Sequence, residues 1–316
     1  MKWSTEVGLV DLPEKITYDS QLLALGSCFA VNMADAFKNY QFRNVINPFG
    51  ILFHPVALGN LFEFAAQNKV FEPDSVFCNQ DVWSCFDAHS DLNALDELDI
   101  LLALNQKLQL FKQTLQSASH VIITLGTAWV YRHIESGKLV ANCHKLPQKL
   151  FVKELLTADE ITKSLQRMQE LALQINPKVQ FIFTISPVRH IKDGVVENQR
   201  SKSNLFVGLH QFLDLNKKAY YFPTYEIMMD ELRDYRFYGR DLLHPNEMAI
   251  TYIWEKFKKH CIAETAYPTM QLVDEVQKGL AHRPFNPHSE QHELFLNKLA
   301  QKLDVLLEQY PFMNFR

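Results

Sequence analysis

Several features that would narrow the class of this protein are absent from its sequence. The five cysteines are odd in number and form no CxxC pair, which argues against a disulfide framework and against a zinc knuckle. No long run of Lys and Arg occurs, and 32 basic residues against 36 acidic ones give a formal net charge of -4. We therefore expect no nucleic-acid partner.

Long apolar stretches are absent as well. No stretch of about 18 residues is free of charged side chains, so the sequence predicts no membrane-spanning helix. The first seven residues contain no uninterrupted apolar segment of the kind that a signal peptide has. These absences and the cysteine usage lead us to expect a cytoplasmic protein without a membrane partner.

What is present is enough apolar sequence for a large core. Of the 316 residues, 47% are hydrophobic, and no internal repeat divides them. Apolar runs of strand type alternate five times with segments of helical periodicity. We expect strands near residues 22–25, 44–46, 120–125, 179–185 and 219–223, and helices near residues 31–37, 55–66, 92–117, 157–173, 201–215, 226–232 and 247–260.

This alternation predicts a three-layer α/β/α fold with a central five-stranded parallel sheet of flavodoxin-like type. Residues 129–142 read as a hairpin that projects from the third strand, and residues 70–90 read either as a lid or as a pair of short strands. The pattern changes at residue 265. We expect one domain over residues 1–264 and a helical C-terminal extension over residues 265–316, packed on the domain and ending in a helix near 290–309.

The first strand ends in a turn that bears two candidate nucleophiles, Ser27 and Cys28, directly after Gly26. A strand, a tight turn and a helix start bring backbone N–H groups and a positive partial charge to one place, which favours a thiolate or a developing oxyanion. The competing interpretation is that Ser27 caps the helix and Cys28 is a small buried residue.

Asp241 and His244 lie three residues apart in the loop before the last helix of the domain. At this spacing the carboxylate can accept a hydrogen bond from one ring nitrogen and leave the other nitrogen free to take a proton from Ser27 or Cys28. The competing interpretation is a surface Asp that caps the next helix beside a solvated His.

Further polar residues follow the other strands and are expected at the same sheet edge. Arg189 can clasp a carboxylate or phosphate, although a surface ion pair is an equal alternative. His190 and His144 are candidates for binding an anionic substrate group, and Trp129 at the start of the hairpin is counted with them. Because no HxH or HExxH spacing is present, we expect neither a metal site that includes His54 nor a cofactor.

Residues 26–30 spell the motif of the GSCFA family, and residues 186–190 and 241–245 resemble further blocks of that family in the same order. The family is similar to the SGNH/GDSL hydrolases, which implies a three-layer α/β/α fold and acyl-ester hydrolysis. By this resemblance Cys28 stands at the nucleophile position, with Ser27 at the place of an aspartate. Asp241 and His244 match the acid and base.

The resemblance also implies an oxyanion hole. Gly50 matches a glycine of that hole, but Ala128 stands where an asparagine is expected. Removal of one such donor typically costs about 2.7–4 kcal/mol of transition-state stabilisation, and Asn47 or the backbone N–H of Gly126 is the substitute that we expect.

The sequence therefore predicts an acyl-ester hydrolase or acyltransferase that acts on an acylated small molecule or carbohydrate. Cys28 is the expected nucleophile, with its pKa lowered by the helix dipole and by a protonated His244, while Ser27 caps the helix. The opposite assignment stays open, with Cys28 as an inert packing residue and Ser27 facing the cleft as the nucleophile. The alternative is a binding protein that keeps the cleft but has lost efficient catalysis, which Ala128 and Ser27 favour. The sequence assigns no oligomeric state.

Overall fold

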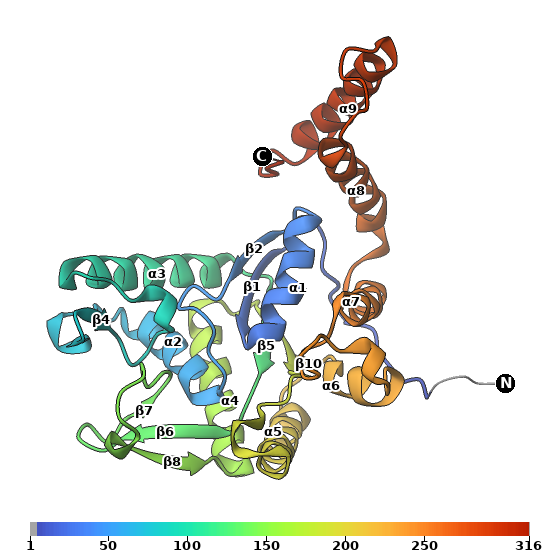
Figure 1. The fold of residues 1–316 in the computed structure, drawn as a ribbon. Coiled ribbons are helices and arrows are strands. Elements are labelled where there is room, and N and C mark those ends of the chain that lie inside the picture. Colours follow the sequence, from blue (N-terminus) through green and yellow to red (C-terminus); the bar gives the residue numbers. More distant parts are fainter. Residues whose placement is uncertain (1–4, 316) are drawn as a thin grey trace.

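The computed structural model describes residues 5–315, and five parallel strands form its central sheet (Figure 1). The order of the strands across the sheet is β10–β9–β5–β1–β2. Numbered along the chain, this is the 2-1-3-4-5 order of flavodoxin-like folds, and it confirms the predicted fold class. The strands are β1 (Gln21–Gly26), β2 (Arg43–Ile46), β5 (His120–Leu125), β9 (Gln180–Ile185) and β10 (Ala219–Tyr221).

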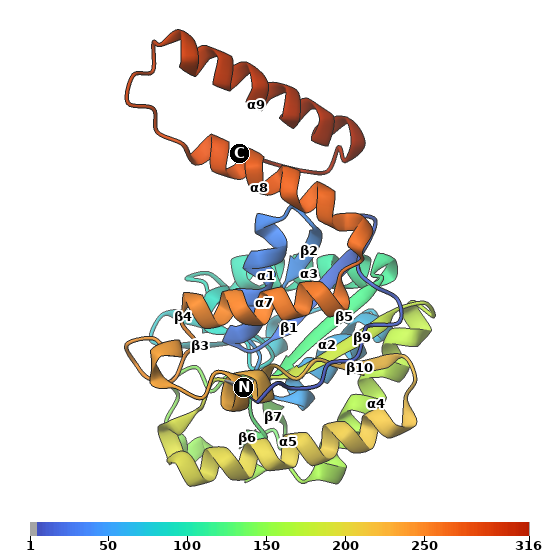
Figure 2. The ribbon, with the colours of Figure 1, turned by 90° about the vertical axis from the view of Figure 1, so that its right-hand side faces the viewer.

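Helices cover both faces of this sheet because successive strand side chains point to opposite faces. Leu23 and Leu25 of β1 belong to one buried cluster, whereas Leu22 and Ala24 belong to another. The first cluster is covered by α2 (Pro55–Gln67), α3 (Glu97–Ser117), α4 (Ala158–Ile175) and α5 (Val195–Leu215). The second is covered by α1 (Cys28–Asn39) and α7 (Glu247–Cys261), which cross in front of the sheet in Figure 2.

Two small antiparallel sheets accompany the central one. The segment 70–90 holds a pair of short strands, β3 (Phe77–Asn79) and β4 (Val82–Ser84), which confirms the second of its two interpretations. The hairpin predicted over residues 129–142 is confirmed, but a third strand joins it. This sheet has the order β7–β6–β8, with β6 (Trp129–His133), β7 (Leu139–Val140) and β8 (Phe151–Leu155).

The expected helix near residues 226–232 is split. A single turn, α6 (Thr224–Glu226), runs directly into a π-helical turn over Ile227–Glu231. The expected helix near residues 290–309 is present as α9 (Glu290–Gln309). A further helix, α8 (Tyr267–Ala281), lies in the extension that is expected to be helical, although the sequence analysis gives it no bounds of its own.

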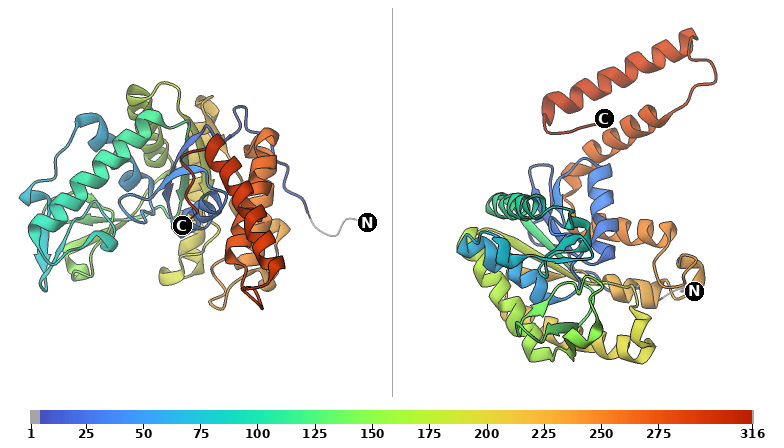
Figure 3. Two further views of the ribbon diagram at one scale, coloured as in Figure 1. Left: turned by 90° about the horizontal axis from the view of Figure 1, so that it is seen from above. Right: turned by 60° about the vertical axis from the view of Figure 1, so that its left-hand side comes forward.

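Helices α8 and α9 form a hairpin that projects from the α/β body (Figures 1 and 3). The segment after α9 returns to that body, where the ring of Tyr310 lies 5.0 Å from the ring of Tyr18. The guanidinium of Arg43 lies 4.1 Å above the ring of Phe312. The backbone N–H of Asn314 donates to Oε1 of Gln41 over 2.8 Å.

The segment before β1 is fastened to the end of α7. The backbone N–H of Ile16 donates to the carbonyl of Cys261 over 2.8 Å, and the N–H of Ala263 donates to the carbonyl of Ile16 over 2.9 Å. These two bonds join the segment before β1 to the C-terminal end of α7 and the residues that follow it. Among residues 5–315, no helix is both long and apolar enough to cross a membrane.

Candidate active site

The carboxyl end of β1 lies at the point where the strand order of the sheet reverses, between β1 and β5. Ligands of doubly wound sheets bind outside the strand ends at this point. Residues 26–28, which we call the nucleophile turn, leave the sheet here. Gly26 has φ of 127°, and a Cβ on it would lie 2.1 Å from the carbonyl oxygen of Thr124, so the turn needs a glycine.

Ser27 occupies the N-cap position of α1, but its side chain does not cap the helix. Ser27 is only 1% exposed, and its Oγ has no hydrogen-bond partner in the described structure. The expected capping bond is therefore wrong. A Cβ on Gly126 would lie 3.2 Å from the Cβ of Ser27, so the side chain of Ser27 packs against the end of β5.

Cys28 is the first residue of α1 and is half-buried. Burial raises the pKa of its thiol above the ordinary value, while its own backbone N–H acts in the opposite direction. The expected lowered pKa is wrong for the free protein, because the loss of solvent outweighs the favourable N–H. A nucleophile here needs a neighbouring base to take its proton.

Asn47 holds the nucleophile turn from the loop after β2. Its Oδ1 accepts a 2.8 Å hydrogen bond from the backbone N–H of Gly26, and its φ of 39° lies in the left-handed region. With the oxygen engaged, the amide nitrogen Nδ2 is left buried without a partner among the described residues. Asn47 therefore has a donor available beside the turn.

The backbone donors expected from the two glycines are already engaged. The N–H of Gly50 donates to the carbonyl of Asn47 over 2.7 Å, and the N–H of Gly126 donates to the carbonyl of Phe53 over 2.8 Å. The N–H of Ala128 donates to Oγ of Ser201 over 2.7 Å. Gly50 and Gly126 thus shape the site without supplying an oxyanion donor in this conformation, which corrects that expectation for both.

Asp241 and His244 form a directly hydrogen-bonded pair, the Asp241–His244 pair. The Nδ1 of His244 lies 2.6 Å from Oδ2 of Asp241, while Oδ1 of Asp241 accepts the backbone N–H groups of Leu243 and His244, each over 3.0 Å. These bonds hold the pKa of the Asp241 carboxyl well below its usual range. With the proton on Nδ1, the Nε2 of His244 is the basic nitrogen.

The loops that carry these residues converge on one edge, as the topology requires. Asn32 and Asp35, one turn or two beyond Cys28, line a cavity together with Glu247 and Ile250 at the start of α7. The pair lies just before that helix. No hydrogen bond joins His244 to either candidate nucleophile within residues 5–315.

A pocket of about 480 Å³ lies beside the Asp241–His244 pair and is lined by Asp241, Arg189, Tyr235 and Tyr238, among others. Nη2 of Arg189 lies 3.0 Å from Sδ of Met229. In the described structure Arg189 joins no carboxylate within ion-pair distance, which disfavours its interpretation as a surface ion pair. Its guanidinium is available to an anionic group in this pocket.

His190 follows Arg189 in the loop after β9 and is half-buried. Its ring meets the ring of Phe53 edge-on at 5.3 Å. Burial lowers the pKa of His190 to about 4, and the charges of Lys202 and His244 act in the same direction. His190 is therefore neutral at pH 7, and an anion-binding role for it would rest on hydrogen bonding.

Two further candidate histidines, His144 and His54, lie close to backbone carbonyls. His144 is buried, and its Nε2 lies 2.7 Å from the carbonyl of Cys85. His54 accepts the N–H of Ala57 at Nδ1 over 3.2 Å, and its Nε2 lies 3.1 Å from the carbonyl of Val140, so it caps α2. Within the described range, no group of three or more His, Cys, Asp or Glu side chains is arranged to hold a metal ion.

Lys202 belongs to the site although the sequence did not point to it. It is fully buried, and its Nζ donates to the carbonyls of Gly126 and Ser186 over 2.8 and 2.7 Å. Burial lowers the pKa of Lys202 to about 7. The available signal is spacing, because Lys202 falls on the buried stripe of α5 with Leu205 and Leu209.

Two protein-family models together match most of the chain. The model of the GSCFA family matches residues 21–257, from β1 into α7. The model described as GSCFA domain protein, C-terminal domain, matches residues 273–316, from the middle of α8 onward. No curated protein matches the chain.

Proposed function

Because the chain belongs to the GSCFA family, we propose that it transfers acyl groups through a thioester on Cys28, as a hydrolase or acyltransferase of the SGNH/GDSL type. The observation that carries this proposal is the 2.6 Å hydrogen bond between Asp241 and His244, with the nucleophile turn at the switch point of the same sheet edge. A carboxylate, an oriented imidazole and a nucleophile at a helix start form the arrangement of covalent acyl transfer.

In the first half-reaction, Nε2 of His244 takes the proton of the Cys28 thiol. The sulfur attacks the acyl carbonyl carbon, a C–S bond forms, and the carbonyl oxygen becomes an oxyanion. Collapse of this intermediate breaks the C–O bond to the leaving alcohol, which takes the proton back from His244. The carboxylate of Asp241 stabilises the imidazolium in between.

In the second half-reaction, water or an acceptor hydroxyl attacks the thioester carbonyl and gives its proton to His244. The C–S bond breaks, and the proton returns to the sulfur. The free acid or the new ester leaves, and the Cys28 thiol is restored.

Two groups support the oxyanion in this mechanism. Nδ2 of Asn47 is an unpartnered donor beside the turn, and the N–H groups of Cys28 and Phe29 at the start of α1 precede the first bond of the helix, in which Ala30 donates to the carbonyl of Ser27. These donors take the place of the asparagine side chain that is expected at position 128, where this chain has an alanine. Asn47 therefore combines two tasks, since its oxygen also holds Gly26 in place.

The substrate in this proposal is an acyl ester of a small molecule or carbohydrate, held in the pocket beside the pair. Tyr235 and Tyr238 offer aromatic faces to a sugar ring, and Arg189 offers a guanidinium to an anionic group. We place the activity in the cytoplasm, on the cysteine usage described above.

The experiment is hydrolysis of a short-chain activated ester, 4-nitrophenyl acetate, by the full chain and its variants. His244→Ala is expected to lower kcat by about 100-fold or more, the usual contribution of a general base. His260→Ala is the matched control, because His260 forms a similar pair outside the site. Its Nδ1 lies 2.7 Å from Oδ1 of Asp11. Unchanged turnover in His244→Ala would refute the mechanism.

The nucleophile is assigned by a second pair of variants. Cys28→Ala is expected to abolish turnover and to prevent a covalent acetyl adduct on intact-mass analysis, whereas Ser27→Ala retains both. The reverse result would make Ser27 the nucleophile.

A binding protein without catalysis is the second candidate, and the raised pKa of the Cys28 thiol favours it. Iodoacetamide separates the two functions. Labelling of Cys28 faster than that of the exposed Cys78 supports an activated nucleophile, and slower labelling supports the binding function.

A further inference from the structure

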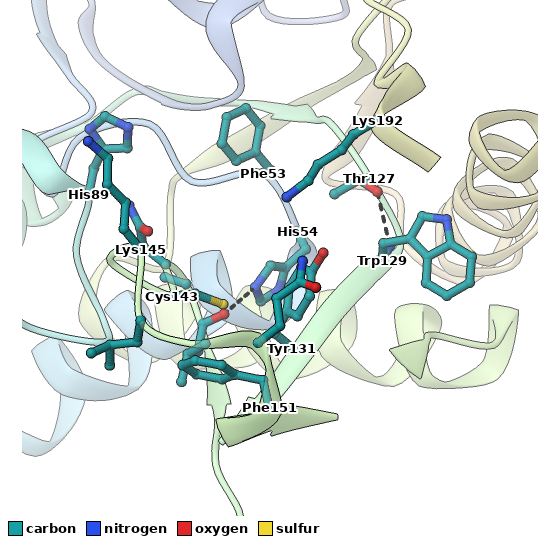
Figure 4. A pocket seen from close by; sticks show the side chains of 15 residues that line it. Phe53, His54, His89, Thr127, Trp129, Tyr131, Cys143, Lys145, Phe151 and Lys192 are labelled. Atoms are coloured by element: carbon teal, nitrogen blue, oxygen red, sulfur yellow. Dashed lines mark hydrogen bonds between the residues drawn. The ribbon is translucent and has the colours of Figure 1, made fainter. Parts of the chain in front are cut away.

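A second pocket, of about 490 Å³, lies between the β7–β6–β8 sheet and the loops that follow β2 and β5 (Figure 4). The nucleophile and the Asp241–His244 pair do not line it. Aromatic side chains form much of its wall, and they are Phe53, Trp129, Tyr131 and Phe151. A volume of this size matches the pockets that hold small molecules.

The Lys, Arg, Asp and Glu side chains that line this pocket include only positively charged ones. Lys145 and Lys192 line the pocket, and none of the 15 lining residues is acidic. In Figure 4 the side chain of Lys192 points inward past Phe53. Its charge acts on the pKa of the Cys143 thiol against the effect of burial, which places the ammonium near that sulfur. We therefore call this cavity the lysine pocket.

The other polar groups of the lysine pocket are mostly donors. Oδ1 of Asn142 accepts the backbone N–H of His144 over 2.9 Å, which leaves the amide nitrogen of Asn142 to donate. The hydroxyl of Tyr131 is a further possible donor. The two ammonium groups and these donors fit a negatively charged ligand group that accepts hydrogen bonds, because no carboxylate is among the lining residues.

We propose that the lysine pocket is a second ligand site, for a small molecule with one phosphate or carboxylate group on a ring or hydrocarbon body. The anionic group lies at the ammonium of Lys192, Lys145 adds positive charge from the other side of the pocket, and the body lies against Tyr131 and Phe151. Thr127 and Phe53 form the side of this site that faces the end of β5. The backbone N–H of Thr127 donates to the carbonyl of Phe53 there. The site is thus a neighbour of the nucleophile turn and is independent of the acyl transfer proposed above.

The test is isothermal titration of the full chain with phenyl phosphate, with benzoate and with neutral benzyl alcohol. It is carried out on the Cys28→Ala variant, so that no turnover contributes and failure of the esterase proposal leaves the result valid. Binding of phenyl phosphate or benzoate, with no detectable binding of benzyl alcohol, is the expected result.

The lysines are then removed together as Lys145→Met and Lys192→Met in one chain. We expect the affinity for the anions to fall at least 10-fold at an unchanged Tm, since both side chains are exposed. Lys149→Met is the matched control, because Lys149 is exposed on the same segment and does not line the pocket.

Absence of anion binding, equal binding of benzyl alcohol, or an affinity that the double variant leaves unchanged would each overturn the proposal. The relative affinity of phenyl phosphate and benzoate identifies which anionic group the site prefers.

Discussion

Lys202 shows how one residue can fasten two loops of the site. Its ammonium lies between the carbonyls at the ends of β5 and β9, and it has no carboxylate within ion-pair distance among the described residues. A buried ammonium is costly unless its donors are satisfied. Two carbonyl acceptors that strand pairing leaves free supply that satisfaction.

We predict that Lys202→Met lowers the free energy of unfolding by about 2 kcal/mol or more, because two buried carbonyls lose their donor. Arg200→Met is the control, since Arg200 lies two residues away with an exposed side chain. Urea unfolding of both variants checks the prediction. Equal stability of the two would show that Lys202 contributes no more than a surface cation.

The residues of the site could be predicted only in part. The Asp241–His244 bond followed from a three-residue spacing, because both groups lie in one loop. The pKa of Cys28 and the free Oγ of Ser27 depend on burial by elements far along the chain, which spacing does not report. Lys202 was missed because lysine is rarely buried, although its position on the stripe of α5 was visible.

At the scale of elements, the start of α2 depends on a histidine. His54 accepts the N–H of Ala57 and caps the helix, and burial lowers its pKa from 6.5 to about 4. Between these values the unfolded chain binds a proton at His54 that the folded chain does not bind. The free energy of unfolding therefore falls as the pH falls from about 6.5 to about 4.

We predict that His54→Asn, which keeps a capping acceptor but does not titrate, reduces the loss of stability between pH 7 and pH 4.5 by roughly 2 kcal/mol. Part of the loss remains, since the pKa of His190 is lowered to about 4 as well. Urea unfolding at the two pH values measures the difference. An identical loss in variant and parent would contradict the assignment of His54.

Elements with a strong local pattern were predicted well. The predicted strand 120–125 agrees with β5, because a continuous apolar run marks a strand that is buried on both faces. The predicted helix 290–309 agrees with α9, because an amphipathic stripe marks it in the local sequence. β8 was missed because its identity depends on pairing with β6, more than a dozen residues earlier. The bounds of α8 were missed within an extension that was expected to be helical, although Met270, Val273 and Val276 mark its buried face.

At the scale of the whole molecule, the projecting α8–α9 hairpin shares a buried cluster with the α/β body. Leu299 and Leu306 of α9 belong to the same cluster as Tyr18 and Phe42. Leu306 is 1% exposed, whereas its neighbour Leu307 is 36% exposed. The two leucines therefore offer an internal comparison.

We predict that Leu306→Ala lowers the free energy of unfolding by about 2–5 kcal/mol, the usual cost of a core Leu→Ala substitution, and that Leu307→Ala costs less than half as much. Chemical denaturation followed by circular dichroism measures both. If the two variants lose equal stability, the hairpin is not part of the common core.

The clasp between Ile16 and the end of α7 also bears on the order in which a ribosome makes the site. The nucleophile turn is synthesised within the first tenth of the chain, but the segment before it can be fastened only when Cys261 and Ala263 have emerged. His244 also emerges late. A nascent chain released early would carry Cys28 without its base, so the proposed chemistry begins only when translation of the α/β body is complete.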